Sequence, residues 1–256
     1  MMPSIFVCHG GPNLVLLNND YTESLKALGK RYSPKAIIIF TAHWESPVLS
    51  ISSTDDQYDM IYDFGGFQKE LYSYSYPAKG STKIAELLRS KLESHGIASR
   101  LNAERGLDHG AWDVLALMYP QADVPVVQVS INPKLAYEEQ YKIGDAIKEL
   151  GLEDIMIIGS GSTVHNLGTL NWNSKETQPW AVEFDDWLID KVEKQDLEAL
   201  YHFESLAPHA KRAIPRNEHI VPLFIAMGSG QKNAAPELLH RSYDYGTLSY
   251  ISVEFL

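Results

Sequence analysis

The chain has 256 residues, of which 45% are hydrophobic and 11% aromatic, so it can bury the core of one large domain. Its formal net charge of −11 and its lack of a basic run disfavour a nucleic-acid partner, because nucleic-acid binding relies on clustered Lys and Arg. No apolar run reaches the ~18 residues of a membrane span and no signal peptide is recognisable, so we expect no membrane partner. The single cysteine, Cys8, excludes an intramolecular disulfide and fits a reducing compartment, which predicts a cytoplasmic location.

The first predicted strand ends in a histidine. Residues 3–8 form a short apolar run, and His9 follows it directly, before two glycines and a proline. In open parallel α/β sheets the ligand crevice lies beyond the carboxyl ends of the strands. The sequence therefore predicts that His9 lies at such a crevice.

Two later strands repeat this arrangement. The run 36–44 is largely apolar and contains His43 near its end. The run 154–159 leads into a Gly/Ser turn that is followed by His165. Further strands are expected at 48–52, 125–130 and 250–255, helices at 18–29, 81–95, 134–150, 180–194, 197–203 and 217–227, and an ordered loop with a short helix at 59–72. This alternation predicts an α/β fold, with one domain over residues 1–256 and a mostly parallel central sheet flanked by helices.

Nine histidines supply the candidate chemistry. Five lie beside glycines, aromatic residues or strand ends: His9, His43, His109, His165 and His219. The other four lie in polar or helix-end surroundings and are expected to be exposed or capping: His95, His202, His209 and His240. Imidazole is the commonest protein ligand of zinc and iron, and three imidazoles leave positions open for water or substrate. No CxxC or HExxH motif is present, so the ligands of a metal would come from distant segments.

Two nucleophile mechanisms compete with a metal site. Ser160 follows a strand in the run Gly-Ser-Gly-Ser-Thr, but a nucleophile elbow requires G-x-S-x-G with the serine at its centre. Cys8 adjoins His9, although a cysteine within an apolar strand is usually an inert core residue. Both mechanisms are therefore disfavoured.

Six ordered blocks that span nearly the whole chain resemble the class III extradiol ring-cleavage dioxygenases, in the branch similar to 4,5-DOPA extradiol dioxygenase. The blocks are His9-Gly-Gly-Pro12, Thr41-Ala-His-Trp-Glu45, Tyr62-Asp-Phe-Gly-Gly-Phe67 with Leu71-Tyr72 and Tyr76-Pro77, Gly106-Leu-Asp-His-Gly-Ala-Trp112, Gly159-Ser-Gly161 with Val164-His-Asn166, and Pro215-Arg-Asn-Glu-His219 with Pro222. In one departure, Ile214 stands where members of this branch often have a histidine, which would alter the rim of the pocket or its polarity.

The resemblance implies roles for individual residues. His9, His43 and His219 would bind the metal at the carboxyl ends of the strands, and His165 would be the general acid/base or a further ligand. His109 would contact the substrate. Related enzymes that use two histidines and a glutamate keep Glu218 open as an alternative third ligand.

The function that this resemblance implies is extradiol cleavage of a substituted, DOPA-like catechol by O2. Fe(II) is expected for that activity, and Zn(II) is possible as the bound metal because three imidazoles suit both ions. Two alternatives use the same histidines: a zinc-dependent hydrolase and a metal- or small-molecule-binding protein without turnover. The physiological catechol, the native metal and the oligomeric state are left open by the sequence.

Overall fold

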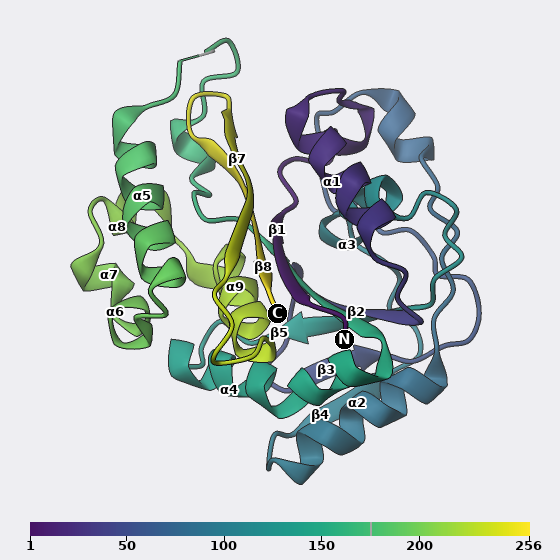
Figure 1. Ribbon diagram of the computed structural model, residues 1–256. Coiled ribbons are helices and arrows are strands. Elements are labelled where there is room, and N and C mark those ends of the chain that lie inside the picture. The colour runs from purple at the N-terminus through teal and green to yellow at the C-terminus, as the bar shows by residue number, and fades with distance from the viewer. Residues whose placement is uncertain (175) are drawn as a thin grey trace.

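Eight strands form one mixed sheet in the order β4-β3-β5-β2-β6-β1-β8-β7 (Figure 1). The computed structural model describes residues 1–174 and 176–256. The strands are β1 (Ser4–Cys8), β2 (Ala36–Glu45), β3 (Leu49–Ser52), β4 (Ser99–Asn102), β5 (Val126–Ile131), β6 (Ile155–Gly161), β7 (Glu237–Asp244) and β8 (Leu248–Phe255). Pairing is parallel through the centre, from β5 through β2 and β6 to β1, and antiparallel where β8 joins β1 and β7 joins β8. The predicted α/β fold with a mostly parallel sheet is confirmed.

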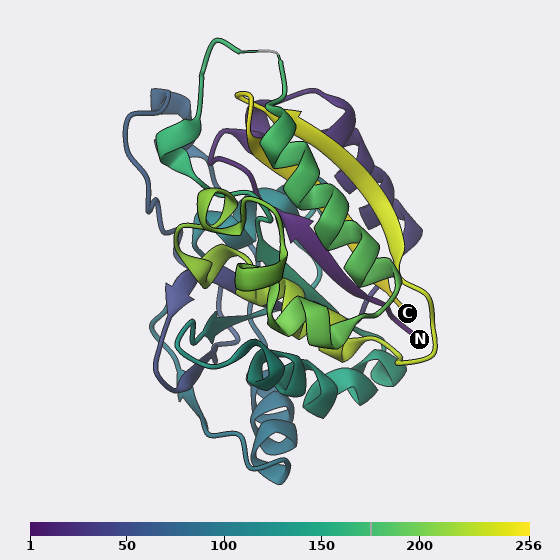
Figure 2. The ribbon, with the colours of Figure 1, turned by 90° about the vertical axis from the view of Figure 1, so that its left-hand side faces the viewer.

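The central strands β1, β2, β5 and β6 are mostly apolar and are buried along almost their whole length because both faces of the sheet are covered. In β2, Ile37 and Ile39 belong to the core on one face, whereas Ile38 and Phe40 belong to the core on the other. Helices α1 and α3 cover the first face, and α2, α4 and α9 cover the second (Figures 1 and 2). These two layers fix the direction in which the end of each strand presents its side chains.

Nine α-helices and five 3-10 helices lie within the described residues. They are η1 (Leu14–Leu16), α1 (Asp20–Arg31), η2 (Lys69–Ser73), α2 (Thr82–Ser94), α3 (His109–Met118), α4 (Tyr137–Ile147), η3 (Lys148–Glu153), η4 (Leu167–Thr169), α5 (Pro179–Glu193), α6 (Leu197–Tyr201), α7 (Phe203–Leu206), α8 (Ala210–Ala213), η5 (Asn217–His219) and α9 (Val221–Ser229). Helix α1 begins with a capping box between Asn19 and Thr22, as its cluster of polar residues indicates. None of the described helices is long and apolar enough to cross a membrane.

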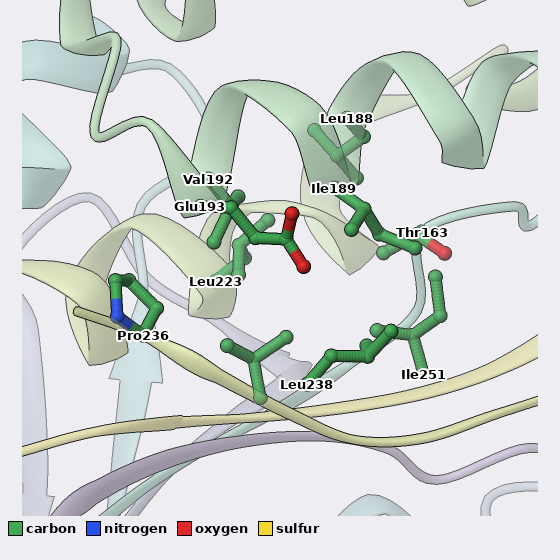
Figure 3. Close-up of a pocket in the computed structure, with 10 residues that line it drawn as sticks. Thr163, Leu188, Ile189, Val192, Glu193, Leu223, Pro236, Leu238 and Ile251 are labelled. Atoms are coloured by element: carbon green, nitrogen blue, oxygen red, sulfur yellow. The ribbon is translucent and has the colours of Figure 1, made fainter.

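The carboxyl-terminal hairpin β7–β8 extends the sheet and packs against α5. Leu188 and Val192 of α5 face Leu238 and Ile251 of the hairpin across an apolar seam (Figure 3). The space left in this seam is about 10 Å³, close to the volume that one water centre needs, so it is a packing joint and not a ligand site.

Helix α3 and strands β4 and β7 are among the elements that were not predicted, and each has a physical reason. Helix α3 is buried on all sides and therefore lacks an amphipathic period. Strands β4 and β7 are the two edge strands: β4 has only four residues, and polar residues weaken the strand pattern in both. The helix predicted over 134–150 ends at Ile147 and continues as η3, and β6 runs on to Gly161 where a turn was expected. The ordered loop with a short helix at 59–72 is present and contains the start of η2.

Candidate metal centre

Three imidazoles from distant parts of the chain meet at one edge of the sheet. His9 follows β1, His43 lies near the end of β2, and His219 ends η5. One ligand nitrogen from each lies within 4.8 Å of the others. The Nε2 atoms of His9 and His43 are 3.1 Å apart. Strand ends in a parallel sheet share one edge, which is why residues 34 positions apart in sequence become neighbours here.

Ser160 determines which nitrogen of His9 carries the proton. The Ser160 hydroxyl donates its single hydrogen to the backbone carbonyl of Gly110. Its oxygen lies 3.0 Å from Nδ1 of His9, so it must accept a hydrogen bond from that nitrogen. Neutral His9 therefore carries its proton on Nδ1 and presents a lone pair on Nε2.

Asp63 holds two imidazoles at once. Its Oδ2 lies 3.0 Å from Nδ1 of His43, and its Oδ1 lies 2.7 Å from Nδ1 of His109. Burial opposes ionisation of this carboxyl, but the hydrogen bonds from His109 and His43 outweigh it and hold the pKa of Asp63 well below its ordinary value. The ionised carboxylate favours a proton on each Nδ1, which leaves Nε2 of both rings free to accept.

His219 completes the set. Its Nδ1 lies 3.0 Å from Oε1 of Glu218, while its Nε2 is buried and has no hydrogen-bond partner in the described part of the chain. Glu218 therefore lies on the side of the ring away from that nitrogen. Burial raises the pKa of Glu218 above its ordinary value.

The three rings thus offer only acceptor nitrogens to one another, and lone pairs cannot bond to lone pairs. Burial, together with the neighbouring imidazoles, holds the pKa values of His9 and His219 well below the ordinary histidine value, so both rings are neutral at pH 7. Neutral imidazoles with one nitrogen fixed by a hydrogen bond are the usual ligands of a transition metal. The donor set fits a metal ion with three histidine ligands.

Two glycines allow the elements to approach closely enough. A Cβ on Gly110 would lie 2.9 Å from Cδ2 of His43 and 3.3 Å from Nδ1 of His9, so a side chain there would displace these rings. A Cβ on Gly161 would lie 2.0 Å from the carbonyl oxygen of His219. That same carbonyl accepts a hydrogen bond from the amide of Ser162 at 2.8 Å, which ties η5 to the end of β6.

A buried carboxylate supports the centre from behind. Asp108 accepts hydrogen bonds from Thr41 at 2.8 Å, from Arg105 at 3.0 Å and from the side-chain amide of Gln128 at 3.1 Å. Arg105 also donates to the backbone carbonyl of His43 at 3.2 Å. This network joins the amino end of α3, which carries His109, to the end of β2.

A cavity of about 380 Å³ opens beside the three rings. Three imidazoles face it, those of His43, His109 and His165, and its remaining lining is mostly aromatic and apolar. The ring of His165 stacks on that of His219, with centroids 3.5 Å apart and planes 12° apart. Burial first, and the neighbouring His43 and His109 next, lower the pKa of His165 to about 4. His165 is therefore a neutral base at pH 7, next to the candidate metal ligands.

A comparison with known families agrees with this geometry. The family model described as the catalytic LigB subunit of aromatic ring-opening dioxygenase matches residues 5–256. The chain belongs to this family.

Relatives of this dioxygenase family cover the chain almost completely. It is 38% identical to a protein of Beta vulgaris named 4,5-DOPA dioxygenase extradiol, over 98% of this chain and 96% of that protein. A protein of the same name in Escherichia coli K12 is 33% identical over 99% of this chain and 94% of its own length. The crystal structure of an uncharacterized Escherichia coli K12 protein superposes with a TM-score of 0.87 at 30% identity and covers all of both chains.

The nucleophile mechanisms find no support in this dioxygenase-family structure. Ser160 is fully buried and its proton is committed to the Gly110 carbonyl, so His9 does not activate it. Burial raises the pKa of the Cys8 thiol to about 12, so no thiolate forms near neutrality. Cys8 and Ser160 are instead buried residues at or near the ends of β1 and β6.

All five histidines singled out in the sequence lie together, and the other four lie elsewhere. His95 and His202 follow helix ends and His209 pairs with Glu183, as expected of exposed or capping residues. His240 differs, because it is half-buried in β7, in a part of the chain where no strand was predicted.

Sequence reasoning assigned no role to Asp63 or Asp108, although both lie within the six blocks. A carboxylate inside a block that otherwise holds aromatic residues and glycines is the signal that could have identified Asp63. The pairing of Met60 with Leu107, which brings the Asp63 loop to the start of α3, is not visible in the sequence.

Proposed function

We propose that this chain is a non-haem, metal-dependent extradiol dioxygenase that opens the aromatic ring of a substituted catechol with O2. Its catalytic unit would be one domain over residues 1–256. The observation that carries the proposal is the convergence of three acceptor nitrogens, on His9, His43 and His219, at the edge of a cavity. Membership of an aromatic ring-opening dioxygenase family supports the reaction class.

His9, His43 and His219 would hold the metal, with Fe(II) as the active ion and Zn(II) as an ion that the same rings can bind. When bound, Fe(II) provides the redox chemistry that couples the catechol to O2. We prefer His219 to Glu218 as the third ligand because a ring nitrogen of His219 lies within 4.8 Å of ligand nitrogens of His9 and His43, whereas Glu218 clusters with His165 and His219 instead.

His165 would move protons for the reaction. Its ring lines the cavity together with those of His43 and His109. A neutral imidazole can accept the proton of a catechol hydroxyl and return it at a later step. Its stacking on His219 keeps this base beside the ring that would bind the metal.

His109 would contact and orient the substrate. Its Nδ1 is held by Asp63, so Nε2 can accept a hydrogen bond from a catechol hydroxyl. Should Nε2 take up that proton, the resulting imidazolium would remain paired with the Asp63 carboxylate and would stabilise negative charge nearby.

Oxygen consumption tests the proposal. Protein loaded anaerobically with Fe(II) is mixed with air-saturated buffer and a series of substituted catechols, and oxygen uptake is measured together with the yellow ring-opened product. Uptake of oxygen in proportion to product is the expected result. Absence of both across the series would overturn the proposal, and activity that persists with zinc and without oxygen would indicate a hydrolase instead.

The variant His165→Ala separates catalysis from binding alone. We expect it to retain the metal, measured by elemental analysis, and to lose turnover by about 10²- to 10⁴-fold, the usual contribution of a general acid/base. His202→Ala, at an exposed helix end, is the matched control and should retain turnover. Unchanged turnover in His165→Ala would remove this residue from the mechanism.

A further inference from the structure

The turn between β7 and β8 places a tyrosine where the backbone favours other residues. Tyr245 has φ of +51° and Gly246 has φ of +79°, and Thr247 closes the turn by a hydrogen bond to the carbonyl of Asp244. Positive φ at both central residues is what a type I′ turn requires, and Asn, Asp or Gly usually occupies the first of these positions. A tyrosine there is strained by contact between its Cβ and its own backbone.

The strained residue faces the cavity of the candidate centre. Tyr245 lines the same cavity as His43, His109 and His165. Its hydroxyl lies 3.4 Å from Nδ2 of Asn13, which lines the same cavity. Strain kept at a binding site points to a role for the side chain rather than for the turn.

Tyr245 also anchors the loop that carries a second aromatic residue. Its carbonyl accepts a hydrogen bond from the amide of Asn171 at 2.9 Å, and the carbonyl of Gly246 accepts one from Gln178 at 2.8 Å. Between these two anchors, Trp172 packs on the Tyr245 ring with centroids 4.5 Å apart. Figures 1 and 2 both show residues 171–174 and 176–178 beside the hairpin tip, at the top of the molecule.

The pair Tyr245–Trp172 forms one aromatic wall of the cavity, and Phe64 with Phe67 forms another. Trp172 is 61% exposed, which leaves much of its indole available to a ligand. The Phe64 ring lies 5.7 Å from both the Phe67 ring and the His109 ring, so the second wall continues to the imidazoles. A ligand that reaches the imidazoles through this cavity would therefore also meet aromatic surfaces.

We propose that Tyr245 determines substrate specificity by building, with Trp172, a wall that selects catechols carrying an aromatic or other planar apolar substituent. This inference rests on the proposed function, because the catechol oxygens must lie at the imidazole end. Aromatic rings in contact gain from buried area and from offset or edge-to-face packing, and an unsubstituted catechol has no substituent to make this contact.

The test compares catechol with 4-phenylcatechol in the wild type and in Tyr245→Asn. Asparagine suits the first position of a type I′ turn, so the variant is expected to unfold at a temperature no lower than that of the wild type. The ratio of kcat/KM for 4-phenylcatechol to that for catechol should fall about tenfold, mainly through KM, since tenfold corresponds to the loss of about one aromatic contact. Tyr245→Phe keeps the ring and should keep the ratio.

Equilibrium binding makes the inference independent of turnover. Under anaerobic conditions the metal-loaded protein is titrated with each catechol, and the same tenfold loss of discrimination is expected in Kd. Trp172→Ala changes an exposed side chain and should lower the ratio in the same direction. It therefore provides the test in case Tyr245→Asn folds poorly. A ratio unchanged in both variants would overturn the inference, and so would equal losses for both catechols. Failure of the wild type to consume oxygen while discrimination in Kd persists would overturn the proposed function alone.

Discussion

At the scale of single residues, the candidate centre depends on which nitrogen of each imidazole carries a proton. Ser160, Asp63 and Glu218 each lie next to an Nδ1 atom of a ring that would bind the metal. Such partners orient the ring and increase its basicity, and their loss usually lowers metal affinity by about 10- to 100-fold. The supporting residues therefore contribute to metal affinity together with the ligands.

Asp63→Asn tests this dependence directly. An amide can accept a hydrogen bond from only one of the two rings and lacks the charge that favours a proton on Nδ1, so we expect metal affinity to fall about 10- to 100-fold. Competition with a chromogenic chelator measures the affinity. Asp59→Asn, at an exposed position on the same loop, is the control. Equal affinities in wild type and Asp63→Asn would show that Asp63 does not orient His43.

At the scale of secondary-structure elements, the site requires helix α3 to touch the ends of β1 and β2. Only a residue without a side chain fits at Gly110, because its Cβ would meet Thr41 at 2.7 Å as well as the two histidines. The Asp108 network fixes the same end of the helix. Helix and strand ends thus form one rigid support for His9, His43 and His109.

The variant Gly110→Ala is expected to lose metal binding, although alanine usually stabilises a helix by about 0.5–1 kcal/mol relative to glycine. The added methyl group would displace His43 and His9, so metal content after loading should fall and the free energy of unfolding should not rise. Elemental analysis and urea denaturation provide the two measurements. Gly65→Ala, where a Cβ meets nothing within 4 Å, should load metal like the wild type. Full metal occupancy in Gly110→Ala would contradict the close packing.

A second element-scale joint, between α5 and β8, predicts a dependence of stability on pH. Asp185 is fully buried, and its Oδ2 accepts a hydrogen bond from Ser249 at 2.7 Å. Burial raises the pKa of Asp185 from 3.8 to about 6. A raised pKa means that the folded state favours the protonated carboxyl, so this contribution to stability is full below pH 3.8 and is lost as the pH rises through 6.

Asp185→Asn cannot ionise and keeps an acceptor for Ser249. The free energy of unfolding of the variant, minus that of the wild type, should therefore be about 2–3 kcal/mol larger near pH 7.5 than near pH 4. Urea denaturation at the two pH values measures this difference. Asp123→Asn, at an exposed carboxylate, is the control. A difference that does not change with pH would show that Asp185 ionises in the folded protein as it does in the unfolded chain.

At the scale of the whole molecule, the three candidate ligands are far apart in the sequence. His9 follows β1, His43 lies in β2, and His219 ends η5. Their nitrogens come together only when β1, β2 and η5 are all in place, so metal binding is coupled to the complete fold. The unfolded chain has no such site. A bound metal should therefore stabilise the whole domain.

Thermal unfolding measures that coupling. Anaerobic Fe(II), or Zn(II), at about 100 times its Kd should stabilise the protein by about 2.7 kcal/mol and raise Tm by about 5–10 °C. His9→Ala should abolish this shift and the metal content while most of the fold remains, and the exposed His95→Ala should retain both. A shift of equal size in His9→Ala would remove His9 from the candidate centre.

Much of the fold was predictable because it follows from local patterns. The runs that become β1, β2 and β6 are mostly apolar, which is typical of strands buried on both faces, and each leads to a histidine. The same reasoning failed for α3 and β7, whose patterns reflect complete burial and an edge position. Only neighbours in space, not neighbours in sequence, explain those patterns.

The sequence by itself determined the central strands and the five candidate histidines, since strand formation depends on nearby residues. Tertiary structure alone decided that Asp63 reaches both His43 and His109, that His165 stacks on His219, and that Tyr245 turns into the cavity. These contacts join residues far apart in the chain, and they exist only where packing brings backbones close. The sequence shows which histidines can bind a metal or a proton, whereas the fold determines their tautomers and the residues that line the cavity.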